Sequence, residues 1–490
     1  MRSSRSYLGW TLILALLPLA PRAVHAQEVS GLALAAAMEE TLVDVIARNE
    51  VSVVAIARIR RQQPGDALNL ELRPDPFGRP AATIGPPELT DPDFIPNEYA
   101  TGVVVDRRGL ILTAYHVLGE ESDYYVRTHD GKFYQAWIKG ADPRSDLAVL
   151  ATEAVDLEPI TFGDAAVLKK GRFVVALGNP YAIARDGQVS ASWGIVSNLA
   201  RKAPPVPDVT DSSGKPTLHH YGTLIQTDAK LNLGTSGGPL LSLDGKMIGL
   251  TVSLAAIRGY ETAAGYAIPV DETFRRVVRT LKQGREVEYG FLGIQPSNLR
   301  PQEIRSGIEG IRVDWVVPGT PAARYGLQPD DIVTAVDGHA IREADSFVLQ
   351  VGKLPVESVT RLSLVRNGRQ RTVDVTLAKY PVRGKQVITS RPDPWRGMRI
   401  DYATAVVDAK GPARGGLAFV DDAVTVTEVQ EGTPAWQSGL RPGMQVSHVG
   451  RTAVRTPKEF HNAVAGKSGP LQLRLVDDDE NPVRTVPPGT

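Results

Sequence analysis

NLGTSGGPLLS, residues 232–242, sets three glycines around a single serine. Glycine loses more conformational freedom on folding than any other residue, so such a cluster marks a turn that other residues cannot adopt. A turn of this kind can point the backbone N–H groups beside Ser236 toward one place, as nucleophilic catalysis requires. The alternative is an ordinary loop between two strands, with Ser236 merely solvated.

Length and composition narrow the classes of protein. A chain of 490 residues is too long for one hydrophobic core, and about three domains are expected. Lys and Arg number 55 and so do Asp and Glu, which gives no general attraction to nucleic acid. The absence of cysteine excludes disulfides, thiolate catalysis and cysteine-ligated metal. We expect no nucleic-acid partner and no cofactor.

The first 26 residues have the layout of a secretory signal peptide. MRSSRS supplies positive charge, residues 7–20 are apolar, and small residues precede Gln27, which places the cleavage site after Ala26. The apolar run is shorter than the roughly 20 residues that span a bilayer, and Pro18 interrupts it. We therefore favour cleavage over an uncleaved anchor. The mature chain is expected to contain no transmembrane segment and to act in the periplasm or outside the cell.

The region from residue 27 to residue 283 predicts one large β domain. A short helix at 30–48 leads into a strand, and the eight prolines of 62–98 forbid regular structure and predict a long loop. From Thr101 onward, short apolar strands alternate with turn signals and lack intervening helices, which indicates a mainly β fold with two six-stranded barrels. DETFRRVVRTLKQG closes the domain as an amphipathic helix.

The C-terminal part contains an internal repeat. VVPGTPAARYGLQPDDIV at 316–333 matches EVQEGTPAWQSGLRPGMQV at 428–446, and the aligned Gly, Thr, Pro and Leu residues keep one constant offset. Two copies of one module therefore follow the β domain. The expected boundaries are 286–380 for the first copy, 381–394 for a linker, 395–478 for the second copy and 479–490 for a flexible tail.

A serine nucleophile needs a base, and the base needs a partner that fixes its tautomer. His116 ends an apolar strand in LILTAYHVLG, and Asp146 precedes another strand in DPRSDLAVL. The order His116, Asp146, Ser236 is that of double-barrel serine proteases, whereas serine comes first in α/β-hydrolases. Asp142 is the rival carboxylate. Asp146 is preferred because the apolar strand follows it at once.

TAYHV, DPRSDLAVL and GTSGGPL, followed by AAGYAIPV, together resemble the HtrA/DegP family of trypsin-like serine proteases. In that family a double β-barrel protease domain precedes one or two PDZ domains. The resemblance implies that Ser236 attacks the scissile carbonyl, His116 removes its proton and Asp146 orients the imidazole. It also implies an oxyanion hole made by the backbone N–H groups of Gly234 and Ser236.

The resemblance further implies an exported, ATP-independent serine endopeptidase that degrades unfolded or misfolded proteins as a homo-trimer or larger homo-oligomer. By analogy, the helix at 30–48 and the proline-rich loop are candidates for subunit contacts. Two other functions remain open from the sequence. One is a non-proteolytic peptide-binding scaffold or chaperone, and the other is a regulatory protease with narrow specificity.

Two groups of residues are candidates for contact with substrate or peptide. An apolar specificity pocket is expected from Leu231, Thr251, Val252, Ser253 and Leu254, while Lys230 is placed on the outer face of its strand. In the first module YGFLGI resembles a carboxylate-binding loop, formed by Phe291, Leu292, Gly293 and Ile294, which would receive peptide C-termini. Phe347 and Val351 on the following helix either contact the ligand or fill the core. In the second module only Gly397 of WRGMRI clearly corresponds to this loop.

The remaining histidines are interpreted as structural or solvated. LHHYG, which holds His219 and His220, could suggest a metal site, but no pattern of carboxylates accompanies it. We expect no metal. The other histidines interpreted in this way are His129, His339, His448 and His461.

Overall fold

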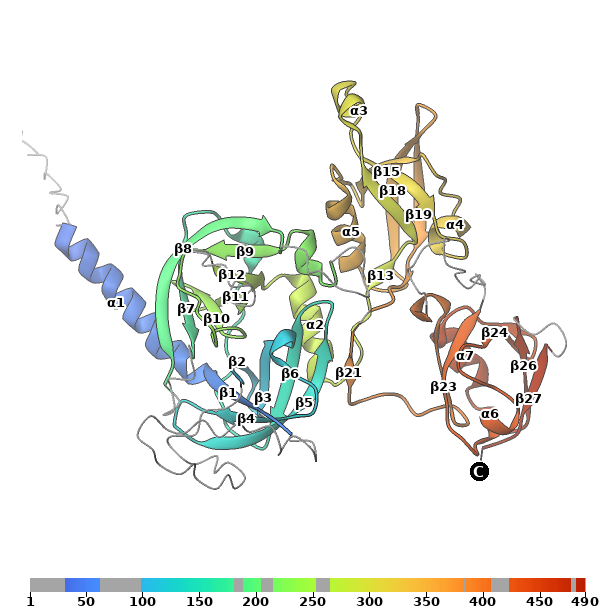
Figure 1. Ribbon diagram of the computed structural model, residues 1–490, viewed down its shortest axis with the longest axis horizontal. Helices are drawn as coiled ribbons and strands as arrows, with labels where there is room; N and C mark the ends of the chain where they lie inside the picture. Colours follow the sequence, from blue (N-terminus) through green and yellow to red (C-terminus); the bar gives the residue numbers. More distant parts are fainter. Residues whose placement is uncertain are drawn as a thin grey trace, which may run out of the picture.

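The computed structural model describes residues 31–61, 98–179, 188–203, 215–252, 265–382, 384–406, 423–476 and 482–489. The expected signal peptide, almost all of the proline-rich loop, and Ser253 and Leu254 lie outside these described residues. Figure 1 shows two barrels side by side, a helix that projects from them, and two smaller β units beyond. Within the described ranges, no helix is long and apolar enough to cross a membrane.

The first barrel closes through six antiparallel strands, in the order β1-β2-β3-β6-β5-β4. Its strands are β1 (Val53–Arg60), β2 (Glu98–Asp106), β3 (Leu110–Ala114), β4 (Ser122–Arg127), β5 (Phe133–Asp142) and β6 (Leu147–Thr152). All six residues of β6 are buried, because its two faces pack against different layers. Strand β21 (Val387–Ile388), which lies within the expected linker, adds to the barrel by pairing with β5.

The second barrel also closes through six strands, in the order β10-β11-β12-β9-β8-β7. Its strands are β7 (Phe173–Gly178), β8 (Ser190–Arg201), β9 (Leu224–Thr227), β10 (Pro239–Ser242), β11 (Met247–Val252) and β12 (Gly265–Pro269). Helix α2 (Glu272–Lys282) follows, with the Asp271 carboxylate as its N-cap on the N–H of Phe274. Phe274 packs in a core shared by both barrels. The prediction of two six-stranded barrels is confirmed.

Helix α1 (Gly31–Asn49) precedes the first strand and leaves most of its surface uncovered. Of its residues only Val45 and Asn49 are buried, whereas Leu32 is 81% exposed and Val43 58% exposed. Val45 sits in the core that the two barrels share. The helix is therefore anchored by its C-terminal end and projects away from the barrels (Figure 1).

The two C-terminal units have the same strand arrangement. The first has the order β14-β15-β16-β18-β19 and the second β22-β23-β24-β26-β27, and in each a short strand, β17 or β25, pairs off the path. The strands of the first unit are β14 (Ile294–Asn298), β15 (Ile311–Val316), β16 (Ile332–Val336), β17 (His339–Ala340), β18 (Val359–Arg366) and β19 (Arg369–Thr376). Those of the second are β22 (Met398–Tyr402), β23 (Val424–Val429), β24 (Gln445–Val449), β25 (Thr452–Ala453), β26 (Leu471–Leu475) and β27 (Val483–Val486). The repeat in the sequence is thus a repeat of structure.

Each unit has its own hydrophobic core. The first core contains Phe347 and Val351 of helix α5 (Ala344–Lys353), so both side chains fill the core. Phe460 of helix α7 (Pro457–Val464) is fully buried in the second core, edge-on to Trp395. Short helices α3 (Pro301–Arg305), α4 (Pro321–Arg324) and α6 (Pro434–Gln437) complete the two units.

The prediction of a flexible tail at 479–490 is wrong over β27. Its residues pair with β26, in a register that sets Leu471 opposite Val486. Val486 is fully buried in the second core. The sequence did not predict this strand for two reasons. A charged run precedes it, and its single buried valine gives too weak a periodic signal.

The Gly-Thr pairs of the repeat have a steric role. Gly293 and Gly397 both have a φ of +89°, which favours glycine, and each lies against the threonine of its own GTPA segment. A Cβ on Gly293 would lie 2.6 Å from Cγ2 of Thr320, and a Cβ on Gly397 would collide with Thr433. Gly397 is therefore the structural equivalent of Gly293.

Replacement of Phe460 by alanine is expected to destabilise the second unit alone. Truncation of a fully buried phenylalanine typically costs about 3–5 kcal/mol, and the core around Phe460 contains no residue of the first unit. Hydrogen exchange followed by mass spectrometry on the full chain should show faster exchange in peptides from 423–476. The control is Phe347→Ala, which should act on peptides from 290–377. Faster exchange in both units with either variant would contradict separate cores.

Candidate active site

Ser236 lies in the turn between β9 and β10, and its backbone is fixed by strands of both barrels. Its carbonyl accepts a hydrogen bond of 3.0 Å from the N–H of Thr101 in β2. The N–H of Gly237 donates to the carbonyl of Thr251 in β11 at 2.9 Å. Ser236 is only 7% exposed. The turn thus lies at the junction of the barrels.

The glycines of this turn allow very close approach of neighbouring chain. A Cβ on Gly234 would lie 2.5 Å from the carbonyl oxygen of Asn179 and 2.7 Å from the ring of Tyr99. A Cβ on Gly237 would collide with the carbonyl oxygen of Thr101. Both glycines have positive φ angles, of +95° and +89°. The glycine cluster is therefore required by conformation and by space.

Gly234 occupies the third position of a type II turn. The N–H of Thr235 donates to the carbonyl of Asn232 at 3.1 Å, which closes the turn. A positive φ at the third residue is the mark of type II and explains why glycine stands there. The hydroxyl of Thr235 also donates to Asn232 O, at 2.7 Å.

Thr101 connects the serine turn to the strands around it. Its hydroxyl donates to the carbonyl of Gly234 at 2.8 Å and accepts from the N–H of Asn179 at 2.9 Å. Its carbonyl accepts from the hydroxyl of Thr113 at 2.8 Å. Thr101 and Thr113 are fully buried, and sequence analysis missed both. The available signal was a threonine inside each of two apolar strands.

His116 lies directly after β3 and contacts the carboxylate of Asp146. The Nδ1 atom of His116 is 2.8 Å from Oδ2 and 3.1 Å from Oδ1 of Asp146, and the His116 N–H donates to Oδ1 at 2.9 Å. Asp146 has a φ of +56°, a left-handed conformation that aspartate adopts more readily than most residues. This arrangement makes Nδ1 the protonated nitrogen and leaves Nε2 as the basic one.

The pKa values of the pair favour a charged carboxylate and a basic imidazole. Burial opposes protonation of His116, but the charge and hydrogen bond of Asp146 outweigh it and raise the pKa of His116. Burial also opposes ionisation of Asp146, but the charge and hydrogen bond of His116 outweigh it and lower the pKa of Asp146. The two groups therefore stabilise each other's charged forms.

Asp142 has a different environment. Its Oδ2 accepts from the N–H of Ser145 at 2.9 Å, from the hydroxyl of Ser145 at 2.6 Å and from the hydroxyl of Tyr289. Burial raises the pKa of Asp142, against these hydrogen bonds. Asp146 is thus the carboxylate that contacts His116, while Asp142 binds within its own turn and to Tyr289.

The residues expected in the specificity pocket are only partly described. Thr251 is fully buried, and its hydroxyl donates to Thr235 O at 2.6 Å, which supports the serine turn. Val252 is 1% exposed and packs in the core shared by the barrels. Among the described residues, Leu231, which is half-buried, therefore remains the candidate for lining an apolar pocket. Lys230 is exposed, in agreement with an outer-face position.

His219 and His220 are buried and structural. The Nε2 atom of His219 donates to the carbonyl of Ser145 at 2.8 Å, and its Nδ1 accepts from Thr223 at 2.9 Å. Burial lowers the pKa of His219. In the part of the chain that the structure describes, no three His, Asp or Glu side chains are grouped so that they could hold a metal ion.

The expected carboxylate loop connects two short strands of the first unit. Phe291 ends β13 (Gly290–Phe291), Leu292 is buried, and Ile294 begins β14. The carbonyl of Gly293 accepts from Val317 N on the side of β15. Strand β14 forms one edge of its sheet, so its outer side offers pairing positions to an added strand.

Comparison with known proteins agrees with this architecture. Residues 100–250 match the model of the trypsin-like peptidase domain, and residues 290–377 match the PDZ domain. A solved structure described as a variant of the HtrA-type protease AlgW with decapeptide is 25% identical, with a TM-score of 0.51. That match covers 69% of this chain and 98% of that one.

Two relatives are named as probable periplasmic serine endoproteases of the DegP-like type. The protein from Chlamydia muridarum is 29% identical over 425 residues, which is 86% of this chain and 80% of the relative. The protein from Pseudomonas putida strain W619 is 30% identical over 372 residues, which is 74% of this chain and 72% of the relative. The chain is a serine endoprotease and belongs to the HtrA/DegP-like family, with a trypsin-like domain followed by a PDZ domain.

Proposed function

We propose that the protein cleaves peptide bonds through Ser236, His116 and Asp146. Ser236 Oγ attacks the scissile carbonyl while Nε2 of His116 takes its proton, and the imidazolium then protonates the leaving amine. Asp146 holds Nδ1 of His116 and stabilises the imidazolium charge. The observation that carries this proposal is the 2.8 Å contact between His116 Nδ1 and Asp146 Oδ2. The strand before His116 also reaches the serine turn through Thr113 and Thr101.

The backbone N–H groups of Gly234 and Ser236 are proposed to bind the oxyanion of the tetrahedral intermediate. The type II turn at Gly234 supports this role, because its positive φ sets the orientation of the peptide group that carries the N–H. Fixed backbone donors at such a site are worth about 3 kcal/mol of the barrier each. Thr101 and Thr251 supply the rigidity that this preorganisation needs.

The proposed substrates are unfolded or misfolded proteins in the periplasm. The relatives are named as periplasmic endoproteases, and residues 1–26 have the layout of an export signal. We further propose a homo-trimer or larger homo-oligomer, in which the exposed apolar residues of α1, such as Leu32 and Val43, contact a second copy.

The first PDZ unit is proposed to bind the C-termini of extended peptides. The N–H groups of the loop from Phe291 to Ile294 would receive the carboxylate, and the peptide would pair with the outer edge of β14. Pro296 lies in β14 and has no N–H to donate to an added strand. Recognition therefore depends more on the terminal carboxylate than on an extended ladder of hydrogen bonds.

Loss of the serine hydroxyl is the direct test of the triad. Ser236→Ala is expected to lower kcat/KM on unfolded casein by about 10⁴-fold or more, because no nucleophile remains. Asp146→Asn should lower it by about 10³–10⁴-fold, because His116 loses the partner that fixes its tautomer. Casein digestion followed by gel and mass spectrometry measures both effects. The control is Ser242→Ala at the end of β10, and equal cleavage by Ser236→Ala and wild type would refute the mechanism.

The pH dependence of kcat/KM should report the pair of His116 and Asp146. Only neutral His116 accepts the serine proton, so activity falls as pH drops through the pKa of His116. Because that pKa is raised, the acid-side midpoint is expected above pH 6.5 in the wild type. In Asp146→Asn the midpoint should move to lower pH, since burial then acts without the opposing carboxylate. A wild-type midpoint below 6.5 would contradict the assignment.

Peptide binding should require a free C-terminus and the first unit. In the Ser236→Ala background, a fluorescent decapeptide with an apolar C-terminal residue is expected to bind at least about tenfold tighter than its C-terminal amide. Gly293→Ala should abolish this preference, because a side chain would collide with Thr320. The matched control is Gly397→Ala in the second unit, which should leave binding unchanged. Equal affinity of acid and amide would exclude carboxylate recognition, as polarisation titrations would show.

A further inference from the structure

The turn that carries Asp146 accepts a hydrogen bond from a residue outside the barrels. The hydroxyl of Tyr289, in the segment between α2 and β13, donates to Oδ2 of Asp142. The same oxygen accepts the N–H and the hydroxyl of Ser145, at 2.9 Å and 2.6 Å. Tyr289 and Asp142 are both at most 1% exposed. One buried carboxylate oxygen therefore connects the turn of residues 142–146 to the start of the first PDZ unit.

Arg144, in the middle of this turn, lies against two tyrosine rings. Its Cζ atom is 3.6 Å from the ring centroid of Tyr380 and 5.4 Å from that of Tyr289. The side chain is buried, and no described residue hydrogen-bonds its Nε or Nη1 atoms. Aromatic faces stabilise a desolvated guanidinium. Gly352 of α5 leaves the space for it, since a Cβ there would lie 2.9 Å from Nη2 of Arg144.

The two tyrosines belong to the paired segments that lead into and out of the first PDZ unit, which we call the stem. Strand β13 pairs with β20 (Ala378–Lys379), and the N–H of Tyr380 donates to the carbonyl of Tyr289 at 2.7 Å. The stem is thus a small rigid ladder whose rings face Arg144. The position of the first PDZ unit and that of the turn are therefore mechanically linked.

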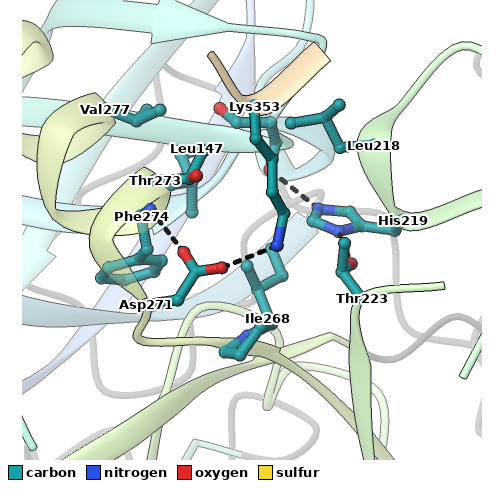
Figure 2. A pocket seen from close by; sticks show the side chains of 12 residues that line it. Leu147, Leu218, His219, Thr223, Ile268, Asp271, Thr273, Phe274, Val277 and Lys353 are labelled. Carbon is teal, nitrogen blue, oxygen red and sulfur yellow. Dashed lines mark hydrogen bonds and ion pairs between the residues drawn. The ribbon is translucent and has the colours of Figure 1, made fainter. Parts of the chain in front are cut away.

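The same turn is held on its other side by the second barrel. Leu218 N donates to Arg144 O at 2.9 Å, and His219 Nε2 donates to Ser145 O at 2.8 Å. Figure 2 shows His219 and Leu218 near Lys353, which reaches from α5 to Asp271 with a separation of 3.0 Å between Nζ and Oδ2. A small cavity lies between them, lined also by Ser145 and by Phe274 of α2. The second barrel, α2 and α5 therefore meet beside the turn that carries Asp146.

We infer that Tyr289 and Arg144 are positioning residues for proteolysis, through which the stem of the first PDZ unit sets the orientation of Asp146. The inference rests on the proposed function, in which Asp146 orients His116. Asp146 has a left-handed backbone, and such a conformation persists only where the surroundings overdetermine it. Without the bond from Tyr289, Asp142 no longer fixes Ser145 as firmly. The Asp146 carboxylate then moves relative to His116 Nδ1.

The decisive variant is Tyr289→Phe, which keeps the ring beside Arg144 and removes the hydroxyl. In the full-length protein, kcat on a fluorogenic peptide is expected to fall about tenfold with KM within about twofold, because a catalytic partner is misplaced while binding is intact. The acid-side midpoint of kcat/KM should also move to lower pH, by roughly half a unit. Asp146 is the charged group that acts on the pKa of His116. Burial lowers the pKa of the nearby His219 and so favours its neutral form. Arg144→Lys, which retains the charge without the planar group, should shift both quantities in the same direction.

Tyr325→Phe is the matched control, because it removes a hydroxyl that bonds to Thr376 at 3.0 Å on an exposed face of the same unit. It should leave kcat and the midpoint unchanged. NMR titration of His116 in protein with labelled histidines, assigned with His116→Gln, gives its pKa without turnover. A lower pKa in Tyr289→Phe supports the inference even if Ser236 proves not to be the nucleophile. If Tyr289→Phe matches Tyr325→Phe in kcat, midpoint and the pKa of His116, the inference is wrong.

Discussion

The hydrogen bond from Thr101 N–H to Ser236 O is the contact on which the proposed active site most depends. Strand β2 belongs to the first barrel and the serine turn to the second, so this bond sets the two barrels in register at the proposed catalytic serine. The Thr101 hydroxyl adds bonds to Gly234 and Asn179, both in the second barrel. Each of these backbone groups is enclosed by protein, and leaving one unpaired would cost about 1–3 kcal/mol. The barrels therefore cannot slide past each other without exposing several buried polar groups at once.

The fold was largely predictable because its signals are local. Short apolar strands punctuated by turns predict barrels, and a repeated GTPA segment predicts a repeated unit. Strand β27 was not predicted from the sequence, because its pattern offers only one fully buried residue, Val486. Strand β21 was not predicted either, because its two residues pair only with β5, more than 240 positions earlier in the chain. Pairings of such long range leave almost no trace in local periodicity.

The contact between His116 and Asp146 was predictable for a different reason. Chemistry restricts the residue types, and the order along the chain restricts the candidates to very few. The residues that hold them in place were missed, because Thr101, Thr113 and Tyr289 look like ordinary members of apolar segments. Asp142 illustrates the limit: it has the right chemistry and lies four residues from Asp146, yet its carboxylate faces Ser145 and Tyr289. Asp146, by contrast, has a left-handed backbone, and its own carboxylate contacts His116.

The residues of the proposed site and those that hold them in place come from the first barrel, the second barrel and the stem. Because they are spread over three parts of the chain, no single segment of the sequence reveals more than a few of them. The first barrel supplies His116 and Asp146, the second supplies Ser236 and the bonds from Leu218 and His219, and the stem supplies Tyr289. A buried cation such as Arg144 is costly to remove from water, and here its surroundings exist only when barrel and stem are docked. Undocking would leave that guanidinium and the Asp142 carboxylate without their tyrosine partners. The proposed positioning role of Tyr289 and Arg144 would couple the free energy of docking the PDZ unit to the geometry of the turn that bears Asp146.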